Sequence, residues 1–226
     1  DNSGNTIDTT ILSSMQLDKT YLNPEPRISA NYSINQDKSI KVAYSRNVQN
    51  IHQLSNTTSA SPTDRWVLTS RNIHPGISDQ ISAGYYFNFA GDMFEASVET
   101  YFKYMQNQID YKNGTVIRAN ETVEKDLLYG QGRAYGLEFY IKKRLGNLTG
   151  WISYTLSRSE RQFDQINNGE WFASRYDRTH DLSVVAMYEI SPRVSISGAF
   201  VFYTGNAVTF PNGKYNISGN LDPNQS

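Results

Sequence analysis

The chain has 226 residues, a formal net charge of −1 and no cysteine. A near-neutral charge gives no basic footprint for a nucleic-acid partner. The lack of cysteine excludes a disulfide scaffold, a thiol nucleophile and a thiolate metal site. No run of about 18 apolar residues occurs, so no transmembrane helix is expected. The 16 Tyr and 10 Phe stand out, and aromatic residues favour strands and membrane-interface girdles.

Residues 1–23 are polar with scattered apolar side chains and are expected to form a loop or the end of a preceding element. Beyond them, apolar and polar residues alternate, which predicts β-strands because successive strand residues point to opposite faces. The predicted strands cover, in chain order, residues 25–34, 39–46, 78–89, 93–105, 133–143, 148–155, 180–190 and 194–203. Strands are thus expected within residues 24–205, and residues 206–226 are expected to form a loop.

The hairpin over residues 133–154 carries the pattern most clearly. Its first arm sets Tyr135, Phe139 and Ile141 on one face against Glu138 and Lys142 on the other. Each arm is about ten residues long, which is the length of a tilted transmembrane β-strand.

The connections alternate in length along the chain. Short turns follow the first, third, fifth and seventh predicted strands, and long loops follow the second, fourth and sixth. Outer-membrane barrels sort their turns and loops in this way, whereas a soluble sandwich has no reason to do so. The second long loop is a candidate for a small hairpin, because residues 109–111 and 115–117 flank the turn signal Asn113-Gly114. The expected fold class is all-β, an antiparallel up-and-down transmembrane β-barrel segment.

In such a barrel the apolar parity faces lipid and the polar parity faces the lumen. The residues expected to face the lumen are Arg27, Lys41, Glu95, Glu99, Lys103, Glu138, Lys142 and Glu189. A carboxylate pair is what a glycosidase uses, but Glu95, Glu99 and Glu138 are expected to pair with Lys103 and Lys142 on the same wall. Both ends of the sequence fall on the long-loop side, so the chain is expected to be part of a larger barrel.

The long loops hold the candidate ligand contacts. Aromatic and Arg side chains on an external loop can hold a ligand, and the candidates are Trp66, Arg71, Trp171, Arg175 and Tyr176. For the charges of residues 158–181 the favoured interpretation is a salt-bridged loop that closes the barrel top. In that interpretation Asp177, Arg178 and His180 fix the base of the loop.

No catalytic or metal chemistry is expected. His52, His74 and His180 lie far apart without metal-ligand spacing, and no phosphate-binding or nucleophile-elbow motif occurs. No cofactor is expected.

Several stretches resemble one family, the barrel of TonB-dependent outer-membrane receptors in the version common in Bacteroidota. They are EPRISANYSI, SIKVAYSRNVQNIHQLS, PTDRWVLTS, SVETYFKYMQNQIDYKNG, GQGRAYGLEFYIKKRLGNLTGWISYTLSRSERQF, INNGEWFASRYDRTHDLSVV and FVFYTGNAVTFPNGKY. They cover nearly all of residues 23–215 in family order. The resemblance implies a barrel of about 22 strands, of which this chain supplies a late-middle portion. It also implies an upstream plug domain and a TonB-contacting segment that lie outside this sequence.

The resemblance predicts a receptor that takes up a nutrient by energised transport across the cell outer membrane. Its expected partners are outer-membrane lipid, the TonB complex and a nutrient such as an iron chelate, a cobalamin-like cofactor, a glycan or a peptide. Two alternatives remain open: a soluble all-β carbohydrate-binding module and a passive porin-like barrel. The soluble module would bury Phe87, Phe102, Phe139, Ile152 and Phe200 in a closed core, whereas the barrel exposes them.

Overall fold

A computed structural model describes residues 19–54, 65–112 and 127–205. The described chain is built almost entirely from antiparallel strands, with one 3-10 turn, η3. The elements are β1 (Arg27–Ser33), β2 (Lys38–Gln49), β3 (Ile51–Leu54), β4 (Arg65–Leu68), β5 (Gly76–Phe89), β6 (Phe94–Tyr111), β7 (Leu127–Lys143), β8 (Leu148–Gln162), η3 (Asn167–Gly169), β9 (Phe172–Ala173), β10 (His180–Ser191) and β11 (Val194–Tyr203). No helix in this part of the chain is long and apolar enough to span a membrane.

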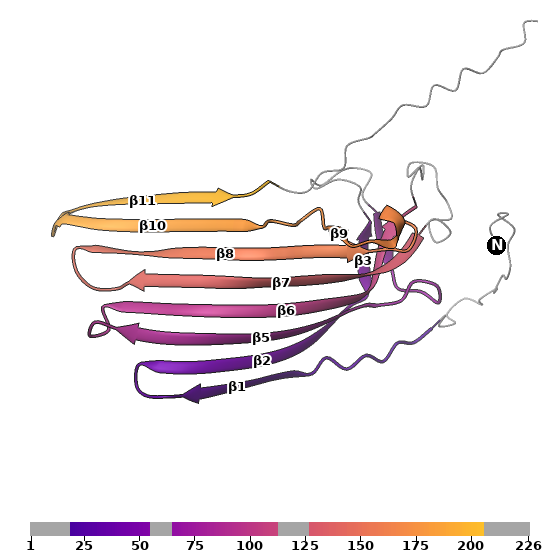
Figure 1. Ribbon diagram of the computed structural model, residues 1–226, viewed down its shortest axis with the longest axis horizontal. Coiled ribbons are helices and arrows are strands. Elements are labelled where there is room, and N and C mark those ends of the chain that lie inside the picture. The colour runs from indigo at the N-terminus through magenta and orange to yellow at the C-terminus, as the bar shows by residue number, and fades with distance from the viewer. Residues whose placement is uncertain (1–18, 55–64, 113–126, 206–226) are drawn as a thin grey trace, which may run out of the picture.

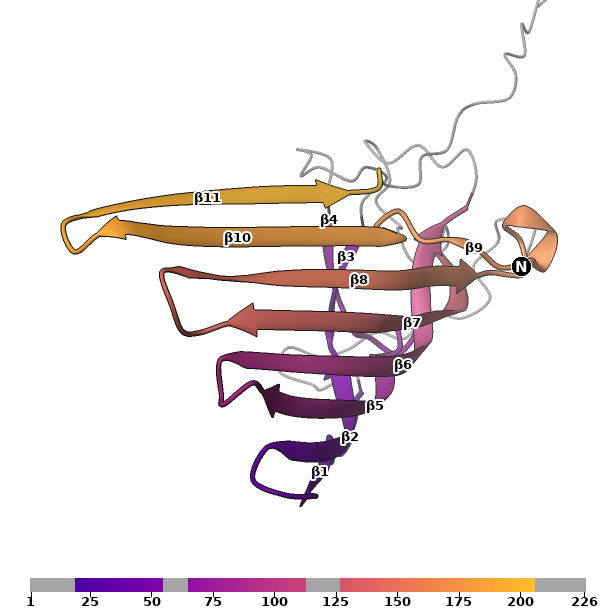
Figure 2. The ribbon, with the colours of Figure 1, turned by 60° about the vertical axis from the view of Figure 1, so that its left-hand side comes forward.

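The main sheet is a single-layer meander. Its strand order is β1-β2-β5-β6-β7-β8-β10-β11, with β9 paired to β8 as the ninth strand, while β3 and β4 form a separate two-stranded sheet. The long strands lie side by side, with tight turns at one end and long connections at the other (Figures 1 and 2). Within the described ranges, the outer edges of β1 and β11 have no strand partner. The expected all-β, up-and-down architecture is therefore confirmed.

Several strands run further toward the long loops than the alternation predicts. β6 continues to Tyr111, β7 begins at Leu127 and β8 continues to Gln162. The segment 109–111, predicted as one arm of a small hairpin, instead ends β6 and pairs with the first residues of β7; residues 115–117 lie outside the described residues. The hairpin of β3 and β4 was not predicted, because its arms have only 4 residues each and lie in a polar connection.

The register aligns the apolar residues into rows that cross the whole sheet. One row runs through Tyr32, Ile40, Tyr85, Val98, Phe139, Tyr154, Leu182 and Phe202. Directly paired residues point to the same side of a sheet. The meander therefore has one continuous apolar face. The register that aligns these rows depends on pairing between strands, and the pattern of a single strand does not determine it.

This apolar face is exposed. Phe102, Phe139, Ile152 and Phe200 keep 46%, 41%, 46% and 58% of their surface accessible. Phe87 is half-buried and stacks against Tyr85 and Phe89 of the same strand. The alternative of a soluble module with a closed core is therefore wrong: within the described residues no second layer covers this face, and an exposed face of this size needs an apolar environment.

The buried core is small and sits at the loop end. Leu54, Ile73, Ile109 and Leu127 form one cluster, against which Val67 and Tyr111 pack. It joins the β3–β4 hairpin to the ends of β6 and β7. This packing holds the small hairpin beside the long sheet, where it forms one wall of the cavities described below.

The opposite face of the sheet carries charges. The residues that the sequence assigns to the lumen all lie on this parity, as their strand partners show: Arg27, Lys41, Glu95, Glu99, Lys103, Glu138, Lys142 and Glu189. For example, Glu99 pairs with Gly84 on one side and Glu138 on the other. The sheet is thus two-sided, apolar on one face and polar on the other.

Candidate functional site

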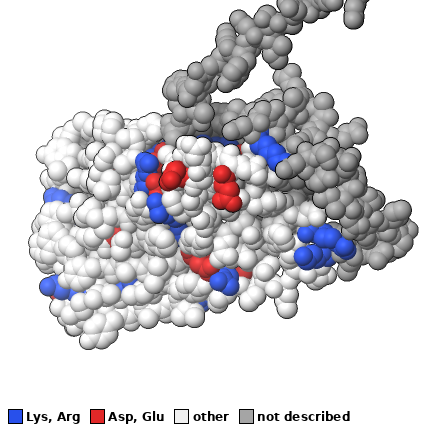
Figure 3. Space-filling model, turned by 45° about the vertical axis from the view of Figure 1, so that its right-hand side comes forward, with Lys and Arg blue, Asp and Glu red and all other residues white. Residues whose placement is uncertain are grey.

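The apolar face ends in a charged level near the long loops. On β7 the residues of this face are apolar from Ile141 to Tyr135, and Lys143 and Arg133 bound them. The ten residue steps from Arg133 to Lys143 span about 33 Å along the strand, or about 23 Å along the normal if the strand is tilted by about 45°. That height matches the apolar band of about 25 Å on outer-membrane barrels. A broad area with few charged side chains is visible in Figure 3.

Ion pairs form the upper border of the band. Arg46 donates from Nε to Oδ1 of Asp79 at 2.7 Å, and the hydroxyl of Tyr44 donates to the same oxygen at 2.6 Å. Further along this level, Glu160 accepts from Arg133 at 2.7 Å and from Arg158 at 3.3 Å. These groups lie beyond the apolar rows, so their charges stay within reach of water.

Glu160 is the most enclosed member of this border, since 12% of its side chain is exposed. Burial by itself raises the pKa of its carboxyl, but the hydrogen bonds from Arg133 and Arg158 outweigh burial and hold the pKa below its ordinary value. The guanidinium of Arg133 also lies 4.1 Å from the ring of Trp171. Trp171 is thereby placed on the outer surface of the sheet.

Residues at this level also hold the base of the long loop that follows β8. Asp177 accepts from the backbone nitrogen of Ser159 at 2.6 Å and from Nη1 of Arg158 at 3.1 Å. The carbonyl of Arg178 accepts from Ser157, and the backbone nitrogen of His180 donates to Thr204. The interpretation that Asp177, Arg178 and His180 fix the base of the loop is confirmed; that the loop closes the barrel top stays a prediction.

The carboxylates of the polar face find other partners than the predicted lysines. Glu99 accepts from Tyr86 at 2.7 Å and from Ser97 at 3.2 Å. Glu95 lies 4.0 Å from Arg144. The expected pairing with Lys103 and Lys142 is wrong for these two carboxylates, because hydroxyl groups of the same face bind Glu99 and Arg144 lies beside Glu95.

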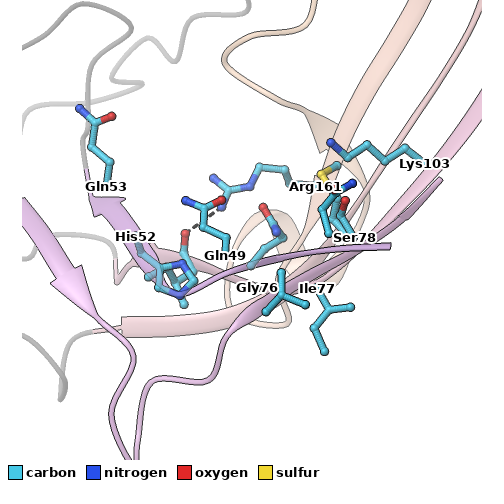
Figure 4. A pocket seen from close by; sticks show the side chains of 13 residues that line it. Gln49, His52, Gln53, Gly76, Ile77, Ser78, Lys103 and Arg161 are labelled. Carbon is cyan, nitrogen blue, oxygen red and sulfur yellow. Dashed lines mark hydrogen bonds between the residues drawn. The ribbon is translucent and has the colours of Figure 1, made fainter. Parts of the chain in front are cut away.

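Two adjoining cavities of about 320 and 360 Å³ lie on the polar side of the sheet at its loop end. Together they are called the rim groove; the residues common to both cavities are Gln49, Gln53, Met105, Gln108, Ile109 and Arg161. The sheet forms one wall, and the β3 strand forms another (Figure 4). Cavities of this size hold small ligands in other proteins.

Arg161 lies at the centre of the rim groove. Its Nη1 donates to Oδ2 of Asp110 at 2.8 Å, and its Nη2 donates to the carbonyl of Ile109 at 2.7 Å. Its Nε is buried and has no hydrogen-bond partner among the described residues. Burial lowers the pKa of Arg161, and Asp110 partly offsets that effect; the side chain is only 17% exposed.

His52, which lines the first cavity, carries a second buried polar atom without a partner among the described residues. The residue is 7% exposed, and its Nε2 has no hydrogen-bond partner among the described residues. Burial lowers the pKa of His52, although a hydrogen bond to the backbone of His74 acts in the opposite direction. The ring is therefore neutral near pH 7. Because Nε2 is unpartnered, we infer that the proton is on Nδ1 and faces His74, so that Nε2 is an acceptor.

The backbone near the rim groove is shaped by a bulge and a glycine. β6 and β7 shift register between Met105 and Gln108, and Asn107 adopts a φ of 54° while its side chain donates to the carbonyl of Pro75 at 2.8 Å. On β7, a Cβ at Gly130 would lie 2.2 Å from the carbonyl oxygen of Gln162. The bulge thus changes the direction of the end of β6, and the missing side chain at Gly130 allows β8 to approach β7 closely.

The candidate ligand contacts do not gather in one place. Arg175 and Tyr176 line the second cavity, and Arg175 lies 4.0 Å from Asp110. Trp66 is 68% exposed on β4, Arg71 is exposed in the bend before β5, and Trp171 lies on the outer surface.

Sequence reasoning missed Arg161 and His52 as functional candidates. Arg161 lies beyond the end of the predicted strand at residue 155, in a segment interpreted as loop. Had β8 been extended, the period of two would have placed Arg161 on the same face as Ser153 and Ser157. His52 carries no such signal, because only the packing of β3 buries it.

Comparison with protein families decides the assignment. Residues 2–226 match the family model described as TonB dependent receptor-like, beta-barrel. The chain belongs to this family. No curated protein matches the sequence.

Members of this family lie in the bacterial outer membrane, where they transport ligands with the help of TonB, and they are not enzymes. The strand pattern, the exposed apolar face and the two-sided sheet agree with this assignment. In the described ranges, no group of three or more His, Asp or Glu side chains is arranged to hold a metal ion.

Proposed function

We propose that this chain is a portion of the barrel of a larger TonB-dependent receptor that takes up a nutrient by energised transport. The observation that supports this most is the continuous, exposed apolar face across the sheet. Such a face is stable against lipid and unstable against water. Among the residues that the structure describes, the outer edges of β1 and β11 have no strand partner, which supports a larger barrel, of about 22 strands as the resemblance implies.

In this proposal the polar face lines the lumen and contacts an upstream plug domain. A nutrient binds from outside at the loop end, energised TonB pulls on the plug, and the nutrient passes along the polar face into the periplasm. The nutrient is an iron chelate, a cobalamin-like cofactor, a glycan or a peptide. The quoted sequence stretches support a receptor of the type common in Bacteroidota.

An uptake experiment in the native bacterium tests the proposal. Nutrients from the four classes, each labelled, are offered to wild-type cells, to cells lacking the receptor and to cells lacking TonB. Energised transport predicts that one nutrient class is lost in both mutants. If uptake depends on the receptor but continues at the wild-type rate without TonB, the chain belongs to a passive barrel instead.

Single cysteines test the orientation of the sheet, since the chain has none of its own. Glu138→Cys in the complete receptor is expected to react with a small water-soluble maleimide, whereas Phe139→Cys is expected to stay protected by lipid. Both residues lie on β7, one step apart. Equal labelling of the two positions would contradict a lumen on the polar side.

A further inference from the structure

We propose that the apolar face binds an anionic phospholipid at the turn end of the sheet. The site consists of a stack of aromatic rings from β5 and β6 that lies between two lysines of the same face, Lys38 and Lys143. The inference goes beyond nutrient transport, because it concerns the lipid that surrounds the barrel wall.

The strand register places both lysines on the apolar face. Lys38 of β2 is paired with Phe87 of β5, and Lys143 of β7 is paired with Phe94 of β6. Directly paired residues point to the same side of a sheet. β5 and β6 lie between β2 and β7 (Figure 1), so three strand spacings, or about 14 Å, separate the two outer strands. Two long side chains at this separation can reach the headgroups of one lipid or of two neighbouring lipids.

Stacked aromatic rings fill the surface between the lysines. Tyr85, Phe87, Phe89 and Phe94 stack in this order, with ring centroids 5.4, 5.7 and 5.0 Å apart. The stack continues from β5 across the turn to β6, and Phe89 keeps 40% of its surface exposed. Girdles of aromatic residues mark the membrane interfaces of outer-membrane barrels. The stack therefore offers an apolar surface to acyl chains just below the level of the headgroups.

The lysines lie at the level of the lipid phosphates. Lys38 is the first residue of β2, and Lys143 is the last residue of β7. Nζ of Lys143 lies beside the turn that follows β7, since a Cβ at Gly146 would be 3.4 Å from it. The short turns of outer-membrane barrels face the periplasm, and the leaflet on that side is made of phospholipids. The source of the phosphate is therefore a phospholipid.

Neither lysine is neutralised by a carboxylate. Within the described ranges no ion pair includes Lys38 or Lys143. The adjoining turns contain Asp37 and Asp92, of which Asp92 accepts a hydrogen bond from Asn88 at 3.1 Å. At this end of β2, β5, β6 and β7 the apolar face itself carries no Asp or Glu. Cationic side chains at a membrane surface attract anionic lipids.

The loop end of the same face differs in this respect. There Arg46 pairs with Asp79 and Arg133 pairs with Glu160, each at 2.7 Å. These arginines already have protein partners, whereas the lysines at the turn end have none among the described residues. The difference favours an anionic lipid at the turn end over one at the loop end.

Native mass spectrometry of the full-length receptor, released from detergent micelles, tests the proposal. The micelles contain equal amounts of phosphatidylglycerol and phosphatidylethanolamine with the same acyl chains, and of lipid A. We expect the wild type to retain phosphatidylglycerol in preference to phosphatidylethanolamine. Removal of the lysine charges should lower this ratio about fivefold for each lysine, or about 25-fold in Lys38→Gln/Lys143→Gln. Equal retention of the two phospholipids by the wild type would overturn the proposal, and so would a preference for lipid A that depends on these lysines.

Matched variants assign the effect to this face. Lys41→Gln/Lys142→Gln removes two charges from the polar face of the same two strands and is expected to leave the ratio unchanged. Lys38→Arg/Lys143→Arg keeps both charges and is expected to keep the preference, which separates a loss of charge from a change in packing. An equal fall in both glutamine pairs, or no fall in Lys38→Gln/Lys143→Gln, would refute the site.

Discussion

Replacement of Ile152 by arginine tests the lipid-facing surface most directly. Ile152 lies on the apolar face of β8, where it pairs with Ile141 and Val184 and keeps 46% of its surface exposed. Its neighbour Ser153 lies one residue further on and points to the polar face. Ile152→Arg and Ser153→Arg therefore introduce the same charge at the same height on opposite sides of one strand.

The expected cost follows from depth. Ile152 lies six residues from Arg158, the first charge on its face toward the loops. Six residues span about 20 Å along the strand, or about 14 Å along the normal at a tilt of about 45°. That is near the middle of a band about 25 Å tall, where arginine costs about 2 to 4 kcal/mol. Leu156, only two residues from Arg158, lies near the interface, where the cost is about 0 to 1 kcal/mol.

Urea-induced unfolding of the full-length receptor in lipid vesicles measures these differences. We expect Ile152→Arg to lower the free energy of unfolding by about 2 to 4 kcal/mol, Leu156→Arg by at most about 1 kcal/mol, and Ser153→Arg by less than Ile152→Arg. If Ser153→Arg costs as much as Ile152→Arg, or if the cost does not fall toward Leu156, the assignment of this face to lipid is refuted.

Three further predictions concern the loop end. Gly130→Ala should destabilise the receptor by about 1 to 3 kcal/mol, because the new Cβ would lie 2.2 Å from the carbonyl oxygen of Gln162; Gly198→Ala, which meets nothing within 4 Å, is the matched control in the same unfolding assay. Glu160→Gln should cost about 1 to 2 kcal/mol at pH 7, since its arginine partners are partly screened by water. The pKa of Glu160 is lowered on folding from 4.5, so its contribution is present above pH 4.5 and lost as the pH falls through the folded value; the difference between wild type and variant should shrink there, and a constant difference would contradict the assignment. Burial also lowers the pKa of His52 on folding, from 6.5. Below pH 6.5 the unfolded state therefore binds more protons than the folded state, so wild-type stability should decline as the pH falls and then level off. Unfolding midpoints from pH 8 to 5 should show this decline in the wild type and a smaller one in His52→Phe.

Local alternation was sufficient to predict the strands that cross the apolar band. The strand Val194–Tyr203 has the bounds that its pattern predicts, and His180–Ser191 differs by one residue. In this region each strand has one environment on each face, so the period of two is uninterrupted. The same signal placed the eight residues that were expected to face the lumen on one face of the sheet.

The signal failed where the environment changes. At the loop end, polar residues such as Glu160 and Arg133 occupy the outer parity because this level lies beyond the apolar band. The alternation of apolar and polar residues disappears there although the backbone pairing continues. The strands therefore looked shorter in the sequence than they are, and Arg161 was assigned to a loop.

The sequence by itself determined the class of the protein: the eight strands of the main meander, the side that each face presents and the sorting of turns and loops follow from local pattern, because a strand in lipid needs an apolar side. The tertiary structure decided which side chains meet at the loop end. Arg161 from β8, Asp110 from β6 and His52 from β3 surround one groove only because the bulge at Asn107 and the packing of Leu54 and Ile109 bring three distant segments together. Contacts of this kind depend on register and packing between strands, which no single segment encodes.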